Sequence, residues 1–256
     1  MVEPKVLRKA QLIMLDMLIE FDALCKKHRL QYWLDSGTLL GAVRHQGFIP
    51  WDDDIDLSMP LEDYHQFLQI AQDELPDSIF LQTSETDPYF KFDYIKLRSN
   101  KARIVELHEK DQLVNYHQGV FVDIFPMLTI ENTAENKQYY ENTFKAIREL
   151  SPVSLHTPDG KDEPLKRAEL VASLKQKHLG WSVKASKVIY SGEMPDVAAW
   201  FDSEAIFPLT TMAFEGFSFP VPNNPAHYLS AIYSFDYKQL PPKDKREVHA
   251  HRIDIN

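Results

Sequence analysis

Residues 32–60 read YWLDSGTLLGAVRHQGFIPWDDDIDLSMP, and this stretch carries a dense group of acids. Four aspartates fall within five positions: Asp52, Asp53, Asp54 and Asp56. We interpret 54–57 as a short strand, which places Asp54 and Asp56 on one face and the apolar residues on the other. Two adjacent carboxylates do not both ionise comfortably without a cation, and hard oxygen ligands suit Mg²⁺ or Mn²⁺. The pattern predicts a metal site, with a solvated or calcium-stabilised acidic turn as the alternative.

The composition is that of an ordinary globular protein of 256 residues, 44% hydrophobic and 26% charged. A net charge of −10 argues against nucleic acid as a partner, because phosphate backbones require basic surface. The single cysteine, Cys25, excludes an internal disulfide and a cysteine-based zinc site, and we expect it to be buried. No secretory signal and no apolar run of membrane-spanning length is visible, so we expect a cytoplasmic protein.

Hydrophobic periodicity and turn residues predict both helices and strands along the chain. Helices are expected over 5–29, 39–44, 61–75, 131–150, 165–180 and 227–233. Strands are expected over 32–34, 54–57, 94–98 and 119–125, the last closed by Pro126, with a hairpin around 215–216. A loop is expected over 151–164, where prolines and charges cluster.

The segment before the acids predicts an anion site. Ser36 and Thr38 are candidates to cap the helix over 39–44, and the free N–H groups at a helix start bind anions. Gly37 and Thr38 therefore form a candidate phosphate-binding loop. Basic residues that would add fixed positive charge for a diphosphate are Arg44, Lys96 and Arg98.

Asp123 is the other acid that requires an explanation. It stands alone in the apolar run Gly-Val-Phe-Val-Asp-Ile-Phe at 119–125, and an isolated buried charge is costly. Service as a third metal ligand beside Asp54 and Asp56 would resolve that cost. An ion pair with one of the three basic residues is the alternative.

Several enzyme classes are not indicated. The sequence has no Gly-x-Ser-x-Gly elbow, no Walker loop and no dinucleotide-binding fingerprint. His45, His117 and His249 are candidates for acid–base work, although a surface or structural role is the commoner one. Of the reaction types considered, metal-assisted phosphoryl transfer is the one that the sequence still allows.

Three stretches resemble one known family. They are SGTLLGAVRHQGFIPWDDDIDLSMP at 36–60, GVFVDIFP at 119–126 and FEGFSFPVPNNPAHYLSAIYSFDYKQLPPKDKREVH at 214–249. These stretches resemble the LicD family, bacterial phosphocholine transferases related to fukutin and the fukutin-related protein. The resemblance covers nearly the whole chain except about 131–200.

The resemblance implies an α+β, nucleotidyltransferase-like fold: a small mixed β-sheet flanked by helices, with a helical and β-hairpin C-terminal part. It implies one domain over 1–256, with a core at 1–130 and an extension at 131–256. By the same resemblance, Gly37 and Thr38 form the phosphate loop, Asp54 and Asp56 are paired metal ligands, and Asp123 is the third acid. Asp52 and Asp53 would support them.

The activity implied by the resemblance is transfer of a phospho-alcohol from a CDP-linked donor, releasing CMP. The donor of the type member is CDP-choline. The acceptor is a hydroxyl of a cell-surface glycan such as teichoic acid or lipopolysaccharide, and a lipid-linked acceptor would bring the protein to the inner face of the membrane. Ribitol, glycerol or ethanolamine phosphate transfer, a true nucleotidyltransferase and a non-catalytic binding module are alternatives.

Choline would require an aromatic cage, because a quaternary ammonium group binds ring faces. The sequence does not show which rings converge. The candidates are Tyr32, Trp33, Trp51, Tyr89, Tyr94 and Tyr116.

Overall fold

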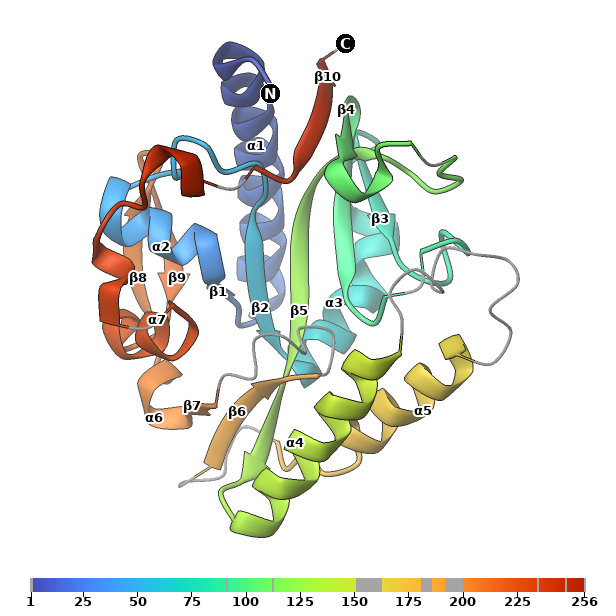
Figure 1. The fold of residues 1–256 in the computed structure, drawn as a ribbon, viewed down its shortest axis with the longest axis vertical. Coiled ribbons are helices and arrows are strands. Elements are labelled where there is room, and N and C mark those ends of the chain that lie inside the picture. The colour runs from blue at the N-terminus through green and yellow to red at the C-terminus, as the bar shows by residue number, and fades with distance from the viewer. Residues whose placement is uncertain are drawn as a thin grey trace.

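The computed structural model describes residues 2–90, 92–111, 113–150, 163–180, 186–191, 200–233, 235–246 and 248–255. Its centre is an eight-stranded mixed sheet (Figure 1). Five strands lie in the spatial order β1 (Trp33–Leu34), β2 (Asp56–Pro60), β5 (Gly119–Glu131), β4 (Ile95–Glu106) and β10 (Ala250–Ile255). The remaining strands are β3 (Ile79–Gln82), which pairs with β4, and β6 (Ser186–Tyr190), which pairs with β5 and with β7 (Phe201–Asp202). β2 and β5 run parallel and the other described pairs are antiparallel, which confirms the predicted mixed sheet.

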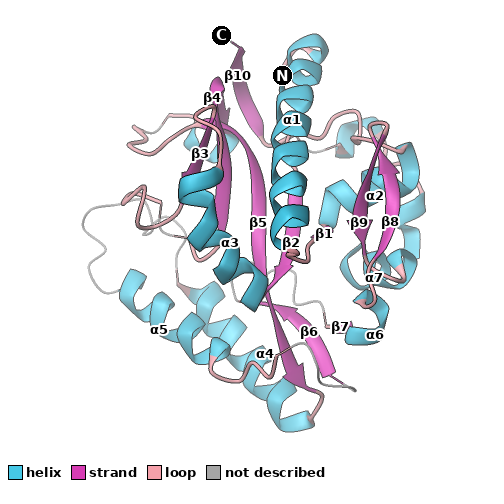
Figure 2. Cartoon of the chain, turned by 180° about the vertical axis from the view of Figure 1, so that it is seen from behind, coloured by secondary structure: helices cyan, strands magenta, loops and turns pink. Residues whose placement is uncertain are grey.

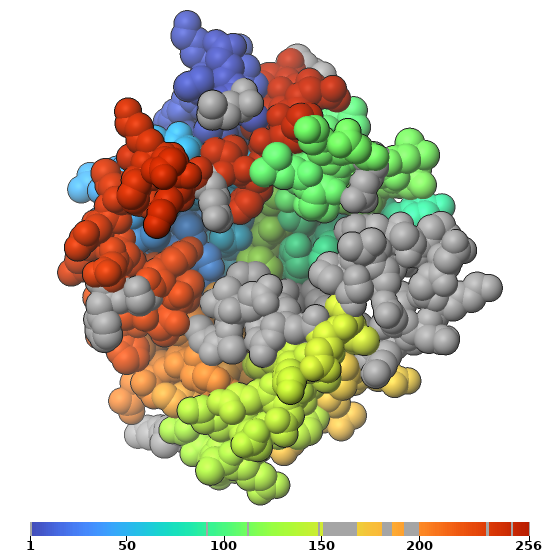
Figure 3. Space-filling model, in the orientation of Figure 1, coloured from blue at the N-terminus to red at the C-terminus, as the bar shows by residue number. Residues whose placement is uncertain are grey.

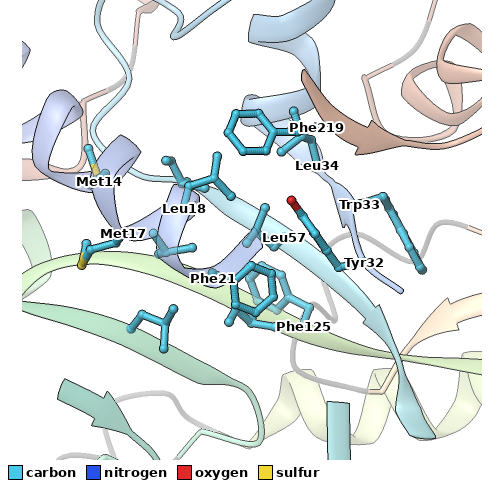
Figure 4. Close-up of a cluster of buried hydrophobic side chains, with 14 of the residues drawn as sticks. Met14, Met17, Leu18, Phe21, Tyr32, Trp33, Leu34, Leu57, Phe125 and Phe219 are labelled. Carbon is cyan, nitrogen blue, oxygen red and sulfur yellow. The ribbon is translucent and has the colours of Figure 1, made fainter. Parts of the chain in front are cut away.

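Two helices cover one face of this sheet, α1 (Pro4–His28) and α3 (Leu61–Glu74), as seen from behind in Figure 2. Both match their predicted ranges. The apolar stripe of α1 is buried, and Met14, Leu18 and Phe21 are fully enclosed. Figure 4 shows this stripe packed toward Leu57 of β2, so the alternate residues of β2 face away from the helices. Cys25 lies on the same helix and is buried, as expected.

A second group of elements flanks the β1 edge: α2 (Ser36–His45), α6 (Ser203–Ile206), α7 (Pro225–Tyr233) and the hairpin of β8 (Thr210–Phe214) with β9 (Phe217–Val221). The hairpin confirms the prediction. Glu215 and Gly216 both have positive φ, as a two-residue turn of this kind requires. The carboxylate of Glu215 accepts hydrogen bonds from Arg8 and from the backbone of Phe48, which ties the hairpin to the N-terminal half. Figure 3 shows C-terminal residues, in red, against the blue N-terminal residues.

A third group lies beyond the far end of β5, where α4 (Ala134–Glu149) packs on α5 (Glu163–Lys175). Their apolar cluster includes Leu128, Ile130 and Tyr140. The predicted polar helix is confirmed, whereas the second helix ends at Lys175, earlier than expected. A loop was predicted over 151–164. Residues 151–162 lie outside the described residues, and 163–164 belong to α5.

The expected end of one strand was wrong. β5 does not end at Pro126 but continues to Glu131. Pairing of β4 with β5 ends at Ile124, so no β4 strand faces Pro126 and its missing N–H is tolerated there. β3, β6, β7 and β10 were not individually predicted. Short 3₁₀ turns complete the described chain at Leu107–Glu109, Phe235–Lys238 and Lys243–Lys245.

Within the described ranges, no helix combines the length and the hydropathy needed to cross a membrane.

Candidate active site

A row of charged side chains crosses three strands on the face opposite α1. Asp56 of β2 is in register with Asp123 of β5, and Asp123 is in register with Lys96 of β4. The Lys96 ammonium lies 2.8 Å from one carboxylate oxygen of Asp123 and donates a hydrogen bond of 2.9 Å to the other. It also lies 3.4 Å from the ring centroid of Phe121. The ion pair offered as the alternative for Asp123 is therefore present, and it lies beside a second acid.

Asp54 lies just before this row and not in the strand. The strand predicted from Asp54 begins two residues later, at Asp56. The reason is Asp53, whose buried carboxylate accepts the backbone N–H groups of His249 and Ala250 and draws the loop toward the C-terminal segment. The carboxylate of Asp54 ends 3.5 Å from Nδ1 of His249.

The charges in this region are strongly unbalanced. Burial raises the pKa of Asp56 well above the usual range of an aspartate, and the carboxylates of Asp54 and Asp123 raise it further. Burial, Asp54 and Asp53 likewise raise the pKa of Asp52. Burial raises the pKa of Asp123 to about 6, although the ammonium of Lys96 opposes the shift. One ammonium does not offset this many carboxylates.

His249 supplies the second positive charge. Hydrogen bonds to Asp53 and Asp54 raise its pKa to about 11, so its ring is protonated at neutral pH. Asp53, Asp54 and His249 have ligand atoms within 4.8 Å of one another, and they form the group of this kind that lies near the predicted site in the described part of the chain. The backbone N–H groups of His249 and Ala250 engage Asp53, and the His249 ring lies 3.4 Å from Asp53 and 3.5 Å from Asp54. This trio therefore acts as an ion-paired clamp on the acidic loop.

The donor chemistry fits a hard divalent cation. Asp54, Asp56 and Asp123 offer carboxylate oxygens, the ligands that Mg²⁺ and Mn²⁺ prefer, and burial followed by mutual repulsion raises the pKa of Asp56. A cation at this point would relieve that repulsion. The assignment of these three residues as metal ligands stays a prediction.

The start of α2 is fastened to the start of β2. The N–H of Asp56 donates to the Thr38 hydroxyl at 2.9 Å, and the N–H of Asp35 donates to the carbonyl of Asp56 at 3.0 Å. The helix begins at Ser36, not at residue 39, and its cap is Asp35, not Ser36 or Thr38. The side chain of Asp35 accepts the N–H of Ser36, whose φ of 43° is in the left-handed region.

Gly37 lies close to the side chain of Asp52. A Cβ atom at Gly37 would lie 3.0 Å from Oδ2 of Asp52, which is tighter than ordinary contact. The predicted phosphate loop thus lies against the acidic loop. Ser36, Gly37 and Thr38 are brought to the acids, and their role toward a diphosphate stays a prediction.

The three predicted basic residues have different surroundings. Lys96 lies in the acid row, as described. Arg98 is buried and donates to Gln82 and to the carbonyl of Gly119, so its guanidinium is engaged inside the protein. Arg44 donates to the carbonyls of Tyr237 and Gln239. Burial lowers the pKa of Arg44 while nearby Asp52 raises it, which places Arg44 at the edge of the acidic group.

Sequence reasoning missed a buried network behind the site. Asp35 is fully buried and accepts hydrogen bonds from Tyr190 at 2.7 Å and, at shorter range, from Ser58. Burial raises the pKa of Asp35, and the hydrogen bonds from Ser58, Tyr190 and Tyr228 lower it. An aspartate before Ser-Gly-Thr is a recognisable cap signal. Nothing in the local sequence marks the two tyrosines, which join it only through the fold.

Comparison with known proteins identifies a family domain within the chain. The family model described as LicD/FKTN/FKRP, nucleotidyltransferase domain, matches residues 29–155. The chain carries a LicD-family domain. Asp54, Asp56 and Asp123 lie within the matched range, whereas Tyr190 and His249 lie beyond it. The LicD domain therefore holds the acid row, and the C-terminal part of the chain completes its surroundings.

Two kinds of relative are similar to the chain. It is 29% identical to the lipopolysaccharide cholinephosphotransferase LicD of Haemophilus influenzae over 261 aligned residues, which cover 95% of each chain. It is 59% identical to the ribitol 5-phosphate transferase FKRP of Mus musculus and Homo sapiens over 34 residues, which cover 13% of this chain and 7% of the relative.

Proposed function

We propose that this protein transfers phosphocholine from CDP-choline to a hydroxyl of a cell-surface glycan and releases CMP. The observation that carries the proposal is the similarity to the lipopolysaccharide cholinephosphotransferase, which extends over 95% of both chains. The cross-strand row of Asp56, Asp123 and Lys96 supports it, because a diphosphate requires both a cation site and fixed positive charge.

In the reaction, the acceptor oxygen forms a bond to the phosphorus that carries the alcohol. The bond from this phosphorus to the oxygen shared with CMP breaks, and CMP leaves with that oxygen. Asp123 takes the hydroxyl proton in this proposal, since a pKa of about 6 leaves it ionised at neutral pH yet more basic than an ordinary aspartate. Lys96 holds Asp123 in place and faces the phosphoryl group with positive charge.

Asp54, Asp56 and Asp123 would hold Mg²⁺ or Mn²⁺. When bound, the ion supplies charge neutralisation on the diphosphate and lowers the pKa of an oxygen attached to it. Asp123 therefore has two candidate roles, proton acceptor and metal ligand.

The test is a product analysis. Purified protein is incubated with Mg²⁺, CDP-choline and lipopolysaccharide or teichoic acid, and the nucleotide and the glycan are both analysed. We expect CMP and a glycan that carries phosphocholine. A cytidylylated glycan would instead show a true nucleotidyltransferase, and unchanged CDP-choline across the acceptors would contradict the proposal.

Ribitol phosphate is the second candidate, favoured by the local 59% identity to the ribitol 5-phosphate transferase. A competition between equal amounts of CDP-choline and CDP-ribitol separates the two, because the transferred alcohol is read directly from the product. CDP-glycerol and CDP-ethanolamine complete the panel.

Location belongs to the same proposal. We place the protein in the cytoplasm, with peripheral contact at the inner face of the membrane where the acceptor is lipid-linked. Fractionation of cells that express the protein, before and after a high-salt wash, would test this.

A further inference from the structure

A row of aromatic rings continues the charged row one step along the sheet. Tyr94 lies two residues before Lys96, and Phe125 lies two residues after Asp123. Residues two apart on a strand share a face, so both rings lie on the face of the acids. The two ring centroids are 4.9 Å apart, and the Lys96 ammonium is 5.5 Å from the Tyr94 centroid.

Two further rings pack on Tyr94. The Phe92 centroid is 5.2 Å from that of Tyr94, and the Phe90 centroid is 5.1 Å from Phe92 and 5.7 Å from Tyr94. Phe90 is buried, whereas Phe92 and Tyr94 are half-buried. The cluster therefore has a closed base and two rings that reach the surface.

Phe92 and Tyr94 border a groove of about 550 Å³ between the loop at 83–85, α3 and the end of α5. Glu85 and Asp93 also line it, and Lys175 lies on the α5 side. The groove thus combines aromatic residues with two carboxylates and one ammonium group. Ring faces attract cations, and carboxylates add to that attraction.

Tyr94 connects the groove with the acid row. Tyr94 is among the residues that line the groove, and its ring centroid lies 5.5 Å from the Lys96 ammonium, which is paired with Asp123. In choline, two carbon atoms separate the phosphate oxygen from the quaternary ammonium group. If the phosphoryl group of the donor faces Lys96, this ammonium group would therefore lie beside the Tyr94 ring. A polyol such as ribitol at the same place would be less favourable, because its hydroxyl groups require hydrogen-bond partners and ring faces do not supply them.

We propose that Tyr94 and Phe92 form the subsite for the alcohol of the donor and select a quaternary ammonium group. This inference rests on the proposed transfer from a CDP-linked donor. It names Tyr94 and Phe92 as the residues that favour choline over ribitol.

The experiment compares ligands that differ only in the alcohol. Calorimetric titrations with Mg²⁺ present measure the affinities of CDP, CDP-choline and CDP-ribitol for the wild type and for Tyr94→Leu, Phe92→Leu and Tyr94→Phe. We expect each leucine variant to bind CDP-choline about threefold to thirtyfold more weakly, with CDP affinity unchanged. Tyr94→Phe keeps the ring face and should bind CDP-choline as the wild type does.

Phe217→Leu is the matched control, because Phe217 is an exposed ring on the distant hairpin. Melting curves verify that each variant folds, and the two leucine variants test the subsite independently. Unchanged CDP-choline affinity in both leucine variants, or equal losses for CDP and CDP-choline, would overturn the subsite while leaving the proposed transfer intact. A wild type that prefers CDP-ribitol would also overturn it. A wild type that binds no CDP compound and releases no CMP would remove the proposed function and the subsite together.

Discussion

Asp56 has acidic neighbours on several sides. The carboxylates of Asp54, Asp123, Asp35 and Asp52 each raise its pKa, after the larger effect of burial. Such a position is unfavourable for an isolated folded chain and favourable for a chain that binds a divalent cation. Function and stability are therefore expected to respond to this residue in opposite directions.

We predict that Asp56→Asn lowers turnover at least about a hundredfold, the scale seen when one group that stabilises transition-state charge is removed. In the absence of metal its melting temperature should equal or exceed that of the wild type, because a repelled charge is lost. Initial rates of CMP release and metal-free melting curves measure the two effects. Asp73→Asn, an exposed acid on α3, is the control. Near-normal turnover in Asp56→Asn would show that the metal assignment is wrong.

Asp63, which lies away from the site, should make the free energy of unfolding depend on pH. Burial raises the pKa of Asp63 from 3.8 to about 6. Between these values the folded state binds more protons than the unfolded state, so this residue lowers the free energy of unfolding as pH rises from 4 to 6. Asp63→Asn should remove that loss, a gain of about 1–2 kcal/mol at pH 8 after allowance for solvent exposure, with little effect at pH 4. Melting temperatures of the wild type and of Asp63→Asn between pH 4 and pH 8 measure this gain. If the two melting temperatures differ by the same amount at every pH, the raised pKa of Asp63 is refuted.

The start of α2 shows how one element depends on several others. Asp35 caps α2, binds Ser58 of β2 and accepts the hydroxyl of Tyr190 of β6. The bond from the Asp56 N–H to the Thr38 hydroxyl and the bond from the Asp35 N–H to the Asp56 carbonyl then fix the distance from the helix start to the acid row. The position of the predicted phosphate loop is consequently set by residues on two strands.

We predict that Asp35→Asn lowers the free energy of unfolding by about 1–3 kcal/mol, because an amide nitrogen replaces one acceptor and leaves a buried donor unpaired. Turnover should fall as well, since the helix start moves relative to Asp56. Asp22→Asn is the matched control: Asp22 is a buried carboxylate that accepts from Tyr32 and Lys26, away from the acid row. It should lose stability and keep its kcat. Equal kcat losses in the two variants would mean that Asp35 has only a structural role.

Sequence periodicity was sufficient for α1, α3, α4 and the hairpin, because each has a regular apolar pattern bounded by turn residues or caps. It was insufficient where long-range pairing decides the outcome. β5 passes Pro126 because β6 pairs beyond it, and Asp54 is outside β2 because Asp53 is bound by His249 and Ala250. The acids themselves were visible as a cluster in the sequence, whereas Tyr190 and Tyr228 reach Asp35 from distant positions that no local pattern reveals.

At the scale of the whole molecule, the LicD domain and the C-terminal part share one main core. Buried residues of that core come from α1 and β5 and also from Phe201, Phe219 and Tyr228. Ligand binding at the acid row should therefore stabilise the entire chain.

We predict that Mg²⁺ with CDP raises the melting temperature of the wild type by about 5–10 °C at a hundred times the dissociation constant, from mass action on the folded state. Scans in EDTA, in Mg²⁺ alone, in CDP alone and in both measure the shift. The Asp56→Asn variant should show little of it. An identical shift in EDTA and in Mg²⁺ would mean that CDP binds without a metal.

The contact of Asp53 with Ala250 joins residues 197 positions apart in the sequence. During synthesis, the acidic loop leaves the ribosome long before the residues that hold it, so a nascent chain has the acids but not their clamp. Long-range pairing of this kind also slows folding, because the intervening chain must be ordered first. The acidic loop thus reaches its final arrangement only after the segment around Ala250 has been made and docked.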